Sequence, residues 1–343
     1  MPKYVYFFGG GKAEGNGKMK DLLGGKGAGL AEMTNIGLPV PAGFTITTEV
    51  CDLYYKNNKN FPEGLEKEVE EHLERLEKLV GKKLGDPNDP LLVSVRSGAP
   101  LSMPGMMETI LNLGLNDQSV EGLAKKTNNR RFALDAYRRF IMMFASIAKG
   151  VERSKFEEKF EEIKNNYTRK RLNIPNDKKV NDTDVNEEEL DMVVKEFKKI
   201  YKEELKEDFP QDPKVQLWEA IRAVFDSWMA EKAVTYRKVE KITGIKGTAV
   251  NVVQMVFGNM GNRSGTGVCF TRDPNTGKNE FYGDYLINAQ GEDVVAGIRT
   301  PLKLSEFAKT DPEAYNQLVE VRKKLEQHYK DMQDLEFTVE EGK

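Results

Sequence analysis

The sequence predicts an α+β fold, from its length, the position of its strand-forming runs and the helical patterns between them. At roughly 100 to 200 residues per domain, 343 residues suggest about two domains. Short runs rich in β-branched and aromatic residues occur before residue 96 and after residue 248. These runs are Tyr4–Phe8, Phe44–Thr48, Leu91–Val95, Ala249–Phe257, Gly267–Thr271, Phe281–Asn288 and Leu335–Val339.

Helical spacing of apolar residues dominates the middle of the chain. It covers Arg131–Lys149, Glu188–Glu207 and Val215–Val239, and the last of these carries both tryptophans. The stretch 114–205 contains no convincing strand pattern, so we expect it to be a helical insert between two α/β lobes. Within it, the polar residues Asn165–Asp184 predict a loop or mobile arm.

Composition excludes several classes of function. A net charge of −3, from 52 basic and 55 acidic residues, argues against nucleic acid or an anionic membrane as the main partner. Two cysteines and two histidines are too few for a disulfide framework or a usual zinc site. The histidines, His72 and His328, lie in amphipathic helical patterns, where a place at the helix rim is the simpler role. With no apolar run typical of a signal peptide or membrane span, we expect a cytoplasmic protein.

The chemistry-bearing residues that remain are glycine, lysine, arginine and carboxylates, the set that phosphoryl transfer uses. The first candidate segment is Leu22–Met33, a glycine loop that contains Lys26 and runs into a helix. Such a loop lets backbone N–H groups approach an anion at a helix N-terminus. It does not match a Walker A loop, because Lys20 and Gly27 stand where that pattern needs glycine and Ser or Thr. The alternative is a tight turn and helix cap with an exposed lysine.

The second candidate segment, Leu91–Ala99, predicts a strand that delivers Arg96 into a Ser/Gly turn. An arginine at a strand exit offers a permanently charged fork of donors to phosphate. The alternative is an ion pair with a local carboxylate. The following Ser102–Met107, which includes Gly105 and Met107, reads as a loop over the site or as core filler.

Two further segments lie near the C-terminal end. Arg263–Val268 predicts a flexible turn that opens a strand and closes over phosphates, or else an ordinary hairpin turn. Asp334 and Glu336 fall on one face of a predicted strand and suit magnesium, although the same alternation describes any half-exposed strand. Glu292 and the acid after it could bind ribose or metal, or cap a helix.

Taken in order, these segments closely resemble the N-terminal nucleotide-binding domain of the pyruvate, phosphate dikinases, members of the ATP-grasp superfamily. The Ser-Met-Pro-Gly-Met-Met run separates the chain from the related phosphoenolpyruvate synthases. The resemblance covers essentially the whole chain, and five ordered motifs carry it. They are Gly24–Gly27, Gly37–Phe44, Ser94–Ala99 with Ser102–Met107, Ile287–Glu292, and Asp331–Phe337.

The resemblance implies an ATP-grasp fold, in which two α/β lobes clamp ATP. We expect residues 1–113 to form the first lobe, with 206–245 packing on it, 114–205 to be the insert, and 246–343 to be the second lobe. By analogy, Lys26 and Arg96 bind phosphates, and the Gly105 loop and Ser264, Gly265, Thr266 and Gly267 cover them. Val253 and Met255 lie along the adenine, Glu292 contacts ribose or metal, and Asp334 and Glu336 hold Mg²⁺.

The resemblance also implies the reaction: pyrophosphoryl transfer from ATP to a histidine on a separate domain, and then formation of phosphoenolpyruvate at a pyruvate-binding domain. Those two domains would be the partners, and the whole enzyme could be a homodimer. We expect this chain to be a fragment, because it stops just before a family strand that carries a glutamine and an arginine of the site. A nucleotide-binding module without turnover and a helical interaction protein remain as alternatives.

Overall fold

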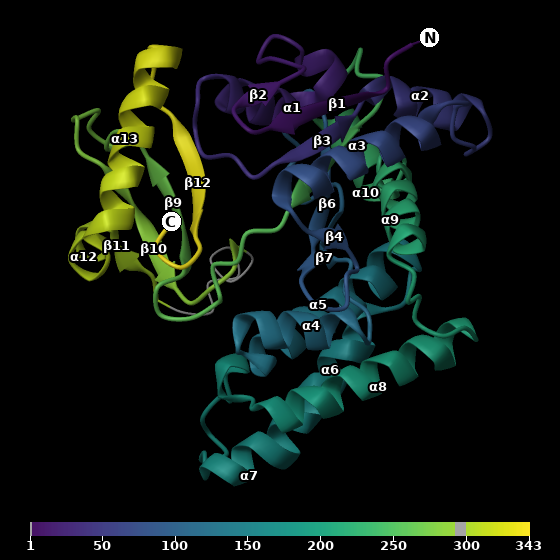
Figure 1. Ribbon diagram of the computed structural model, residues 1–343, viewed down its shortest axis with the longest axis vertical. Coiled ribbons are helices and arrows are strands. Elements are labelled where there is room, and N and C mark those ends of the chain that lie inside the picture. Colours follow the sequence, from purple (N-terminus) through teal and green to yellow (C-terminus); the bar gives the residue numbers. More distant parts are fainter. Residues whose placement is uncertain (1, 292–299) are drawn as a thin grey trace. The chain divides into compact units, whose positions relative to one another are not determined.

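The computed structural model describes residues 2–291 and 300–343, which fall into two compact units (Figure 1). The first unit runs to Met255 and the second from Val256 to Lys343. Both combine helices with a sheet, which confirms the predicted mixture of α and β structure. No helix among the described residues is long and apolar enough to cross a membrane.

The first unit is built on a six-stranded sheet whose described pairings are all antiparallel, in the order β2-β1-β3-β8-β6-β7. The central strand β8 therefore pairs with two strands that precede it by about 150 residues or more in the chain. The bounds are β1 (Val5–Gly9), β2 (Lys12–Ala13), β3 (Gly43–Ile46), β6 (Val93–Gly98), β7 (Thr109–Leu113) and β8 (Ala249–Gln254).

Helices cover both faces of this sheet. The helix α1 (Lys20–Asn35) lies on the face that carries Thr45, because Gly27 of α1 comes closest to that side chain. The helix α3 (Leu65–Val80) lies on the opposite face, where its His72 ring contacts Phe44. The remaining elements around the sheet are α2 (Thr48–Lys56), the short pair β4 (Lys83–Leu84) and β5 (Pro90–Leu91), α9 (Pro213–Ser227), which packs on β6, β7 and β8, and α10 (Glu231–Val239).

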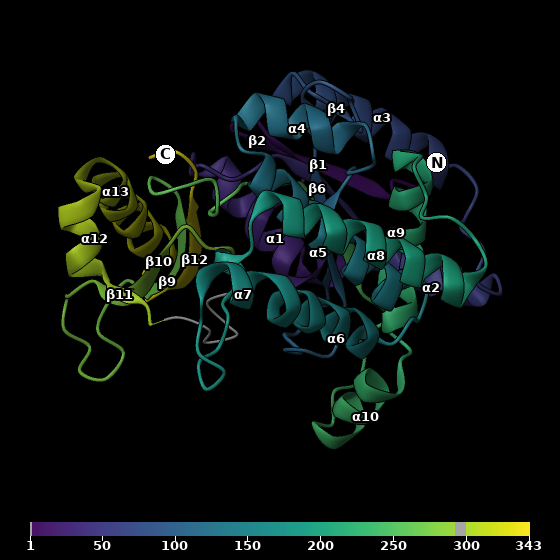
Figure 2. The ribbon, with the colours of Figure 1, turned by 90° about the horizontal axis from the view of Figure 1, so that it is seen from below.

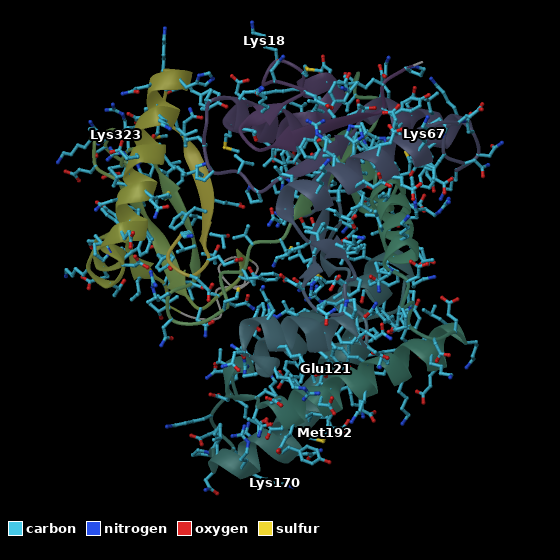
Figure 3. The ribbon with its side chains drawn as sticks, in the orientation of Figure 1. Lys18, Lys67, Glu121, Lys170, Met192 and Lys323 are labelled. Atoms are coloured by element: carbon cyan, nitrogen blue, oxygen red, sulfur yellow. The ribbon has the colours of Figure 1, made fainter. Side chains whose placement is uncertain are left out.

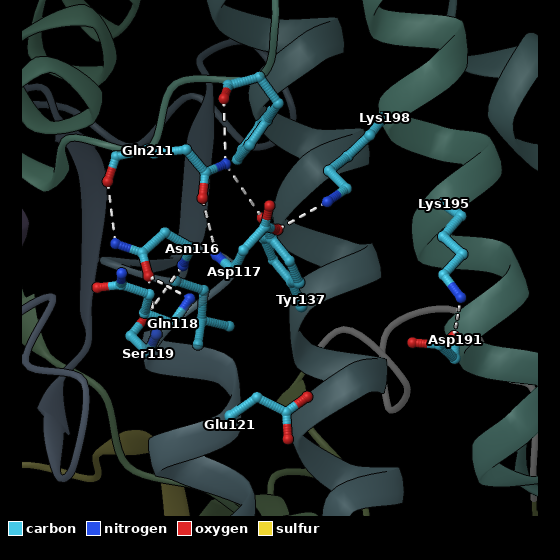
Figure 4. Close-up of polar contacts among 12 residues, drawn as sticks. Asn116, Asp117, Gln118, Ser119, Glu121, Tyr137, Asp191, Lys195, Lys198 and Gln211 are labelled. Atoms are coloured by element: carbon cyan, nitrogen blue, oxygen red, sulfur yellow. Dashed lines mark hydrogen bonds and ion pairs between the residues drawn. The ribbon is translucent and has the colours of Figure 1, made fainter.

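Residues 114–205, all of them described, contain helices and no strand, as predicted (Figure 2). The central helix α5 packs on α8 and on β7. Close to where the insert begins and ends, Asn116 Nδ2 donates to the carbonyl of Gln211 at 2.9 Å, and Asp117 accepts from Tyr137 and Lys198 (Figure 4). The helices are α4 (Ser119–Thr127), α5 (Arg130–Ala148), α6 (Arg153–Ile163), α7 (Arg169–Leu172) and α8 (Glu187–Leu205).

Two local predictions are wrong in part, and the loop expected within 165–184 is confirmed only for residues 173–181. The polar stretch 165–184 begins as helix, because a π-helical turn (Lys164–Thr168) joins α6 to α7, and the helix ends only at Asn173, which has a φ of 52°. Buried Lys164 ties this turn to Asp182 with a 3.0 Å hydrogen bond, an interaction that polarity alone did not indicate. The single helix expected over 215–239 is divided into α9 and α10 by a turn at 228–230.

The second unit contains a four-stranded antiparallel sheet in the order β11-β10-β9-β12. Its core forms where Cys269, Tyr285 and Phe307 pack together with Leu318 and Val339. The elements are β9 (Gly265–Phe270), β10 (Tyr282–Ile287), β11 (Leu302–Lys303), α12 (Leu304–Thr310), α13 (Pro312–Tyr329) and β12 (Asp334–Val339).

The boundary between the units lies later than the expected residue 246. Strand β8 pairs with β3 and β6, so the run that we assigned to the second lobe completes the sheet of the first unit. The sequence analysis also missed β7, a short strand that contains Asn112 with a φ of 59°.

Four of the lysines labelled in Figure 3 are exposed, and they come from both units: Lys18, Lys67, Lys170 and Lys323. Charged side chains of this kind typically cover the solvated faces of a protein.

Candidate functional site

The glycine loop at the start of α1 is docked on the exit of strand β6. Gly24 has a φ of 69°, and a β-carbon built on it would lie 1.8 Å from the carbonyl oxygen of Gly98. The next residue, Gly25, donates its N–H to the carbonyl of Ala99 at 2.9 Å. Only glycine allows both the left-handed conformation and this approach. The loop therefore brings exposed Lys26 to the end of the strand that carries Arg96.

A row of polar side chains crosses the sheet beneath this loop. Asn251 of β8 stands opposite Thr45 on β3 and opposite Arg96 on β6, so the three side chains project from one face. The Thr45 hydroxyl donates to Asn251 Oδ1 at 2.8 Å. Gly27 rests on this pair, since a β-carbon at 27 would lie 2.9 Å from the nearest atoms of both. The face of the sheet under α1 is thus polar at its centre.

The structure brings the two predicted phosphate ligands to the same junction. Gly98 follows Arg96 by two residues and shares its face, and a β-carbon at 98 would lie 3.6 Å from Lys26 Cβ. The N–H of Gly98 donates to Thr248 Oγ1 at 3.0 Å, which fixes the strand end. Two cations, one half-buried and one exposed, therefore lie beside a glycine-lined strand exit. Such an arrangement suits a polyanion.

The two residues predicted to line adenine are on or next to β8. Val253 lies two residues from Asn251 on the same face and stands opposite Gly43 and Ser94. Met255 follows the strand, is buried, and donates its N–H to the carbonyl of Leu92 at 2.9 Å. Val253 therefore shares the sheet face of Arg96, whereas Met255 stays a prediction from resemblance.

The segment with Gly105 and Met107 forms the loop between β6 and β7. Met103 is buried and its carbonyl accepts from the N–H of Met106 at 3.2 Å, which makes a turn. Gly105 has a φ of 71° and is exposed. Glu108, at the base of the loop, pairs with Lys232 of α10 at 2.6 Å. The structure confirms a loop here, and its role over phosphates stays a prediction.

Residues 264–267, expected as a flexible turn, lie at the start of β9 and are buried. Ser264 Oγ accepts from the N–H of Glu341 at 3.0 Å, and Thr266 Oγ1 donates to the carbonyl of Phe337 at 3.1 Å. Gly265 and Gly267 lie against aromatic rings: β-carbons there would come 2.2 Å from Tyr285 Oη and 2.5 Å from Phe337 Cζ. Packing within the second unit explains why glycine is needed at 265 and 267, and a role of this segment over phosphates stays a prediction.

The two predicted metal ligands, Asp334 and Glu336, lie on β12, at the edge of the second sheet. Both are exposed, while Leu335 and Phe337 between and after them pack against the core, as the alternation predicts. Among the residues that the structure describes, no group of three or more potential metal ligands occurs. A metal at this pair stays a prediction, and Glu292 lies outside the described residues.

The cysteines are poor nucleophiles. Burial raises the pKa of both the Cys51 and the Cys269 thiol to about 12, so each stays protonated at neutral pH. The pKa of Glu14, in contrast, falls to about 2: burial works against ionisation, but hydrogen bonds from the Phe7 N–H, Lys3 and Arg75 outweigh it. These groups hold the fold together and lie outside the polar row.

Sequence reasoning missed Thr45, Thr248 and Asn251. Asn251 did leave a signal, because it is a lone amide inside the apolar run Ala249–Val253. A polar residue within a buried strand requires a partner or a ligand.

Comparison with known proteins identifies the family of the chain. The family model described as "Pyruvate phosphate dikinase, AMP/ATP-binding domain" matches residues 20–63 and 57–314. The chain is 54% identical over 341 residues to the chloroplastic pyruvate, phosphate dikinase of Flaveria trinervia, covering 99% of this chain and 35% of that protein. It is 52% identical over 345 residues to pyruvate, phosphate dikinase of Clostridium symbiosum, covering 100% of this chain and 38% of that protein.

The chain thus spans little more than a third of the length of these relatives. The family match runs through the glycine loop, the strand that carries Arg96, and β8 to β10. The resemblance drawn from five short motifs is confirmed. This chain belongs to the family of the AMP/ATP-binding domain of pyruvate phosphate dikinase.

Proposed function

We propose that the chain binds ATP with Mg²⁺ and passes the β,γ-pyrophosphoryl group to a histidine of another domain. The observation that carries the proposal is the junction of the α1 glycine loop with the exit of β6. There Lys26 of α1 lies on the side of the sheet from which the Arg96 side chain projects. The resemblance adds the ATP-grasp fold, and the family description adds the nucleotide.

The residues at the junction fit a polyphosphate. Glycines at 24, 25 and 98 keep side chains out of the way of the backbone, and Lys26 and Arg96 supply positive charge. In a transfer of this kind the protein positions the phosphates and neutralises the charge that builds up on them. A guanidinium can hold two phosphate oxygens at once, whereas the lysine acts as a point charge.

Asp334 and Glu336 are the proposed ligands of Mg²⁺, because this ion prefers carboxylate oxygens and phosphates. Bound Mg²⁺ would supply charge neutralisation to the phosphates. The Gly105–Met107 loop and residues 264–267 are the proposed covers of the phosphates. The side chain of Val253 is the proposed contact of the adenine face.

In the transfer, a histidine nitrogen attacks the β-phosphorus, the bond from that phosphorus to the oxygen bridging the α-phosphate breaks, and AMP leaves. The overall reaction proposed for the whole protein converts ATP, phosphate and pyruvate to AMP, diphosphate and phosphoenolpyruvate. The phosphohistidine and pyruvate-binding domains are the proposed partners. The Flaveria relative is described as chloroplastic, and the cytoplasmic location expected for this chain stays a prediction.

A nucleotide-binding module without turnover is the second candidate. The packing of both histidines against aromatic rings favours it for this chain alone. His72 Nδ1 lies 2.6 Å from the carbonyl of Glu68, and its ring packs against Phe7 and Phe44. His328 lies on α13 against Tyr329. The proposed acceptor histidine therefore belongs to another domain.

Calorimetric titration with ATP and Mg²⁺ tests the proposal, with Arg96→Ala as the variant. We expect wild-type binding and a loss of about 1.5–3 kcal/mol in the variant, because a charge-assisted hydrogen bond is removed. Arg153→Ala, which removes an exposed i,i+4 ion pair on α6, is the control and should bind normally. Absence of binding by the wild type at millimolar ATP would refute the proposal, and normal binding by Arg96→Ala would make that arginine structural.

A further inference from the structure

The Asn251 amide is buried at the centre of the first sheet, and only its oxygen is hydrogen-bonded to a described residue. The residue is 0% exposed. Its Oδ1 accepts from the Thr45 hydroxyl at 2.8 Å, but its Nδ2 has no hydrogen-bond partner among the described residues. Because buried donors in native proteins are nearly always paired, this one requires an explanation.

The unpaired donor faces the junction of the glycine loop with β6. A β-carbon at Gly98 would lie 2.7 Å from Asn251 Nδ2, and the next neighbour, Lys26 Cβ, would be 3.6 Å away. Any side chain at 98 would press on the amide. On its other side, the amide oxygen and Thr45 lie under Gly27. Asn251 is thus enclosed between two glycines, with its free donor towards the Lys26 end.

A buried donor without a partner costs stability in the ligand-free protein, a pattern typical of functional positions. The Thr45 hydroxyl donates to Oδ1, and Nδ2 lies on the Gly98 side. Because Lys26 and Arg96 lie nearby, the group best suited to accept a hydrogen bond from Nδ2 is an anionic oxygen.

We propose that Asn251 is a positioning residue of the phosphate site: its Nδ2 donates a hydrogen bond to an oxygen that enters the Lys26–Gly98 junction when a polyphosphate binds. That oxygen belongs to the polyphosphate or to a water bound to it. The inference rests on the proposed function, and it adds a neutral donor to the two cations. Thr45 supports the site by holding this amide in place.

The test compares Asn251→Leu with the wild type and with Ser146→Ala, a control on α5 of the insert that removes a different buried polar atom without a described partner. Urea unfolding measures stability, and calorimetry measures affinity for ATP with Mg²⁺ and for AMP. In Asn251→Leu the removal of the unpaired Nδ2 opposes the loss of the partner of the Thr45 hydroxyl, so we expect the variant to remain folded, to bind ATP roughly tenfold more weakly and to bind AMP within about twofold of the wild type. Ser146→Ala should match the wild type in both affinities.

A second variant keeps the idea testable if the leucine protein does not fold. Asn251→Asp retains the oxygen that accepts from Thr45 and replaces the donor with an acceptor, so ATP affinity should fall further than in Asn251→Leu. In the wild-type protein labelled with ¹⁵N-asparagine, the side-chain signal that disappears in Asn251→Asp should move on addition of ATP and stay in place with AMP. A purely structural amide would not show this difference.

Either of two affinity results overturns the inference alone: wild-type ATP affinity in a folded Asn251→Leu protein, or equal losses for ATP and AMP. An Asn251 amide signal that does not move at saturating ATP has the same meaning. If the wild type itself does not bind ATP, the proposed function fails first, and this inference fails with it.

Discussion

Two glycine-rich segments, Gly24–Gly27 in the first unit and Gly265–Gly267 in the second, look alike in sequence and have different neighbours in the structure. In the first, missing side chains let a helix start approach the carbonyl of Gly98 and a buried polar pair. In the second, they let the Tyr285 and Phe337 side chains lie against a central strand. Glycine indicates a close approach, and the partner decides whether the approach serves binding or packing.

The neighbours of each segment make the distinction physical. Beneath the first segment lie an amide and a hydroxyl, and beside it are two cations, so the surroundings favour an anion. Around the second, Tyr285 stacks on Phe307 with ring centroids 4.1 Å apart, and Tyr285 and Phe337 are nearly parallel at 5.8 Å. An aromatic stack of this kind stabilises a core. Substitution of the glycines can separate the two roles.

The largest effect is expected from Gly24→Ala. A β-carbon there would lie 1.8 Å from a backbone oxygen, and the φ of 69° is unfavourable for alanine. We expect a loss of more than about 3 kcal/mol in unfolding free energy, measured by urea denaturation. Gly29→Ala on the same helix meets no described heavy atom within 4 Å and should stabilise by about 0.5–1 kcal/mol. Equal behaviour of the two variants would contradict the close approach of Gly24 to β6.

Gly267→Ala should have the next largest effect, about 2–3 kcal/mol, because its β-carbon would overlap the ring of Phe337. Hydrogen exchange should show faster opening of β9 with little change in β8. The double variant Gly267→Ala/Phe337→Leu removes the ring and should recover part of the loss. If the double variant is no more stable, or if ATP affinity falls while β9 stays protected, the glycine has a binding role and the packing explanation is wrong.

A smaller effect is expected at the carboxylate pair of β12. Asp334→Asn and Glu336→Gln alter exposed side chains, so stability should change by less than about 0.5 kcal/mol. If the pair holds Mg²⁺, calorimetry should show that the affinity for ATP with Mg²⁺ falls roughly tenfold. Glu320→Gln, an exposed carboxylate on α13 that pairs with Lys323, serves as the control. Unchanged affinity in both variants would show that the two carboxylates do not bind Mg²⁺ and belong to an ordinary half-exposed strand.

The smallest effect concerns acid stability of the first unit. The folded-state pKa of Glu14 is about 2 against an ordinary 4.5, so its ionised form stabilises the fold above pH 4.5, and this contribution is lost as pH falls from 4.5 towards 2. Because the group is partly exposed, we expect less than about 1 kcal/mol. In Glu14→Gln the stability of β1, measured by hydrogen exchange, should change less between pH 5 and 2.5 than it does in the wild type. An unchanged pH profile would exclude this carboxylate as the cause.

The sequence predicted the mixed fold and the all-helical insert, because periodicity and turn residues act locally. It could not predict that β8 lies between β3 and β6, since strand order depends on contacts between distant parts of the chain. The polar row escaped notice for the same reason: Thr45 and Asn251 become neighbours only through that pairing. Residues 264–267 were misread as a turn, because the sequence does not distinguish a glycine that packs under an aromatic ring from a glycine in a turn.

The central place of β8 also bears on how the protein is made. During synthesis β3 and β6 emerge first, and their shared neighbour is completed only when residue 254 has left the ribosome. Until then the two strands present unpaired edges, a state that invites aggregation. The helices of the insert pack largely on one another, α5 on α4 and α8, and all of them leave the ribosome before β8. We therefore expect the first sheet to be completed late, and a chain released at residue 248 to carry a structured insert on an unfinished sheet.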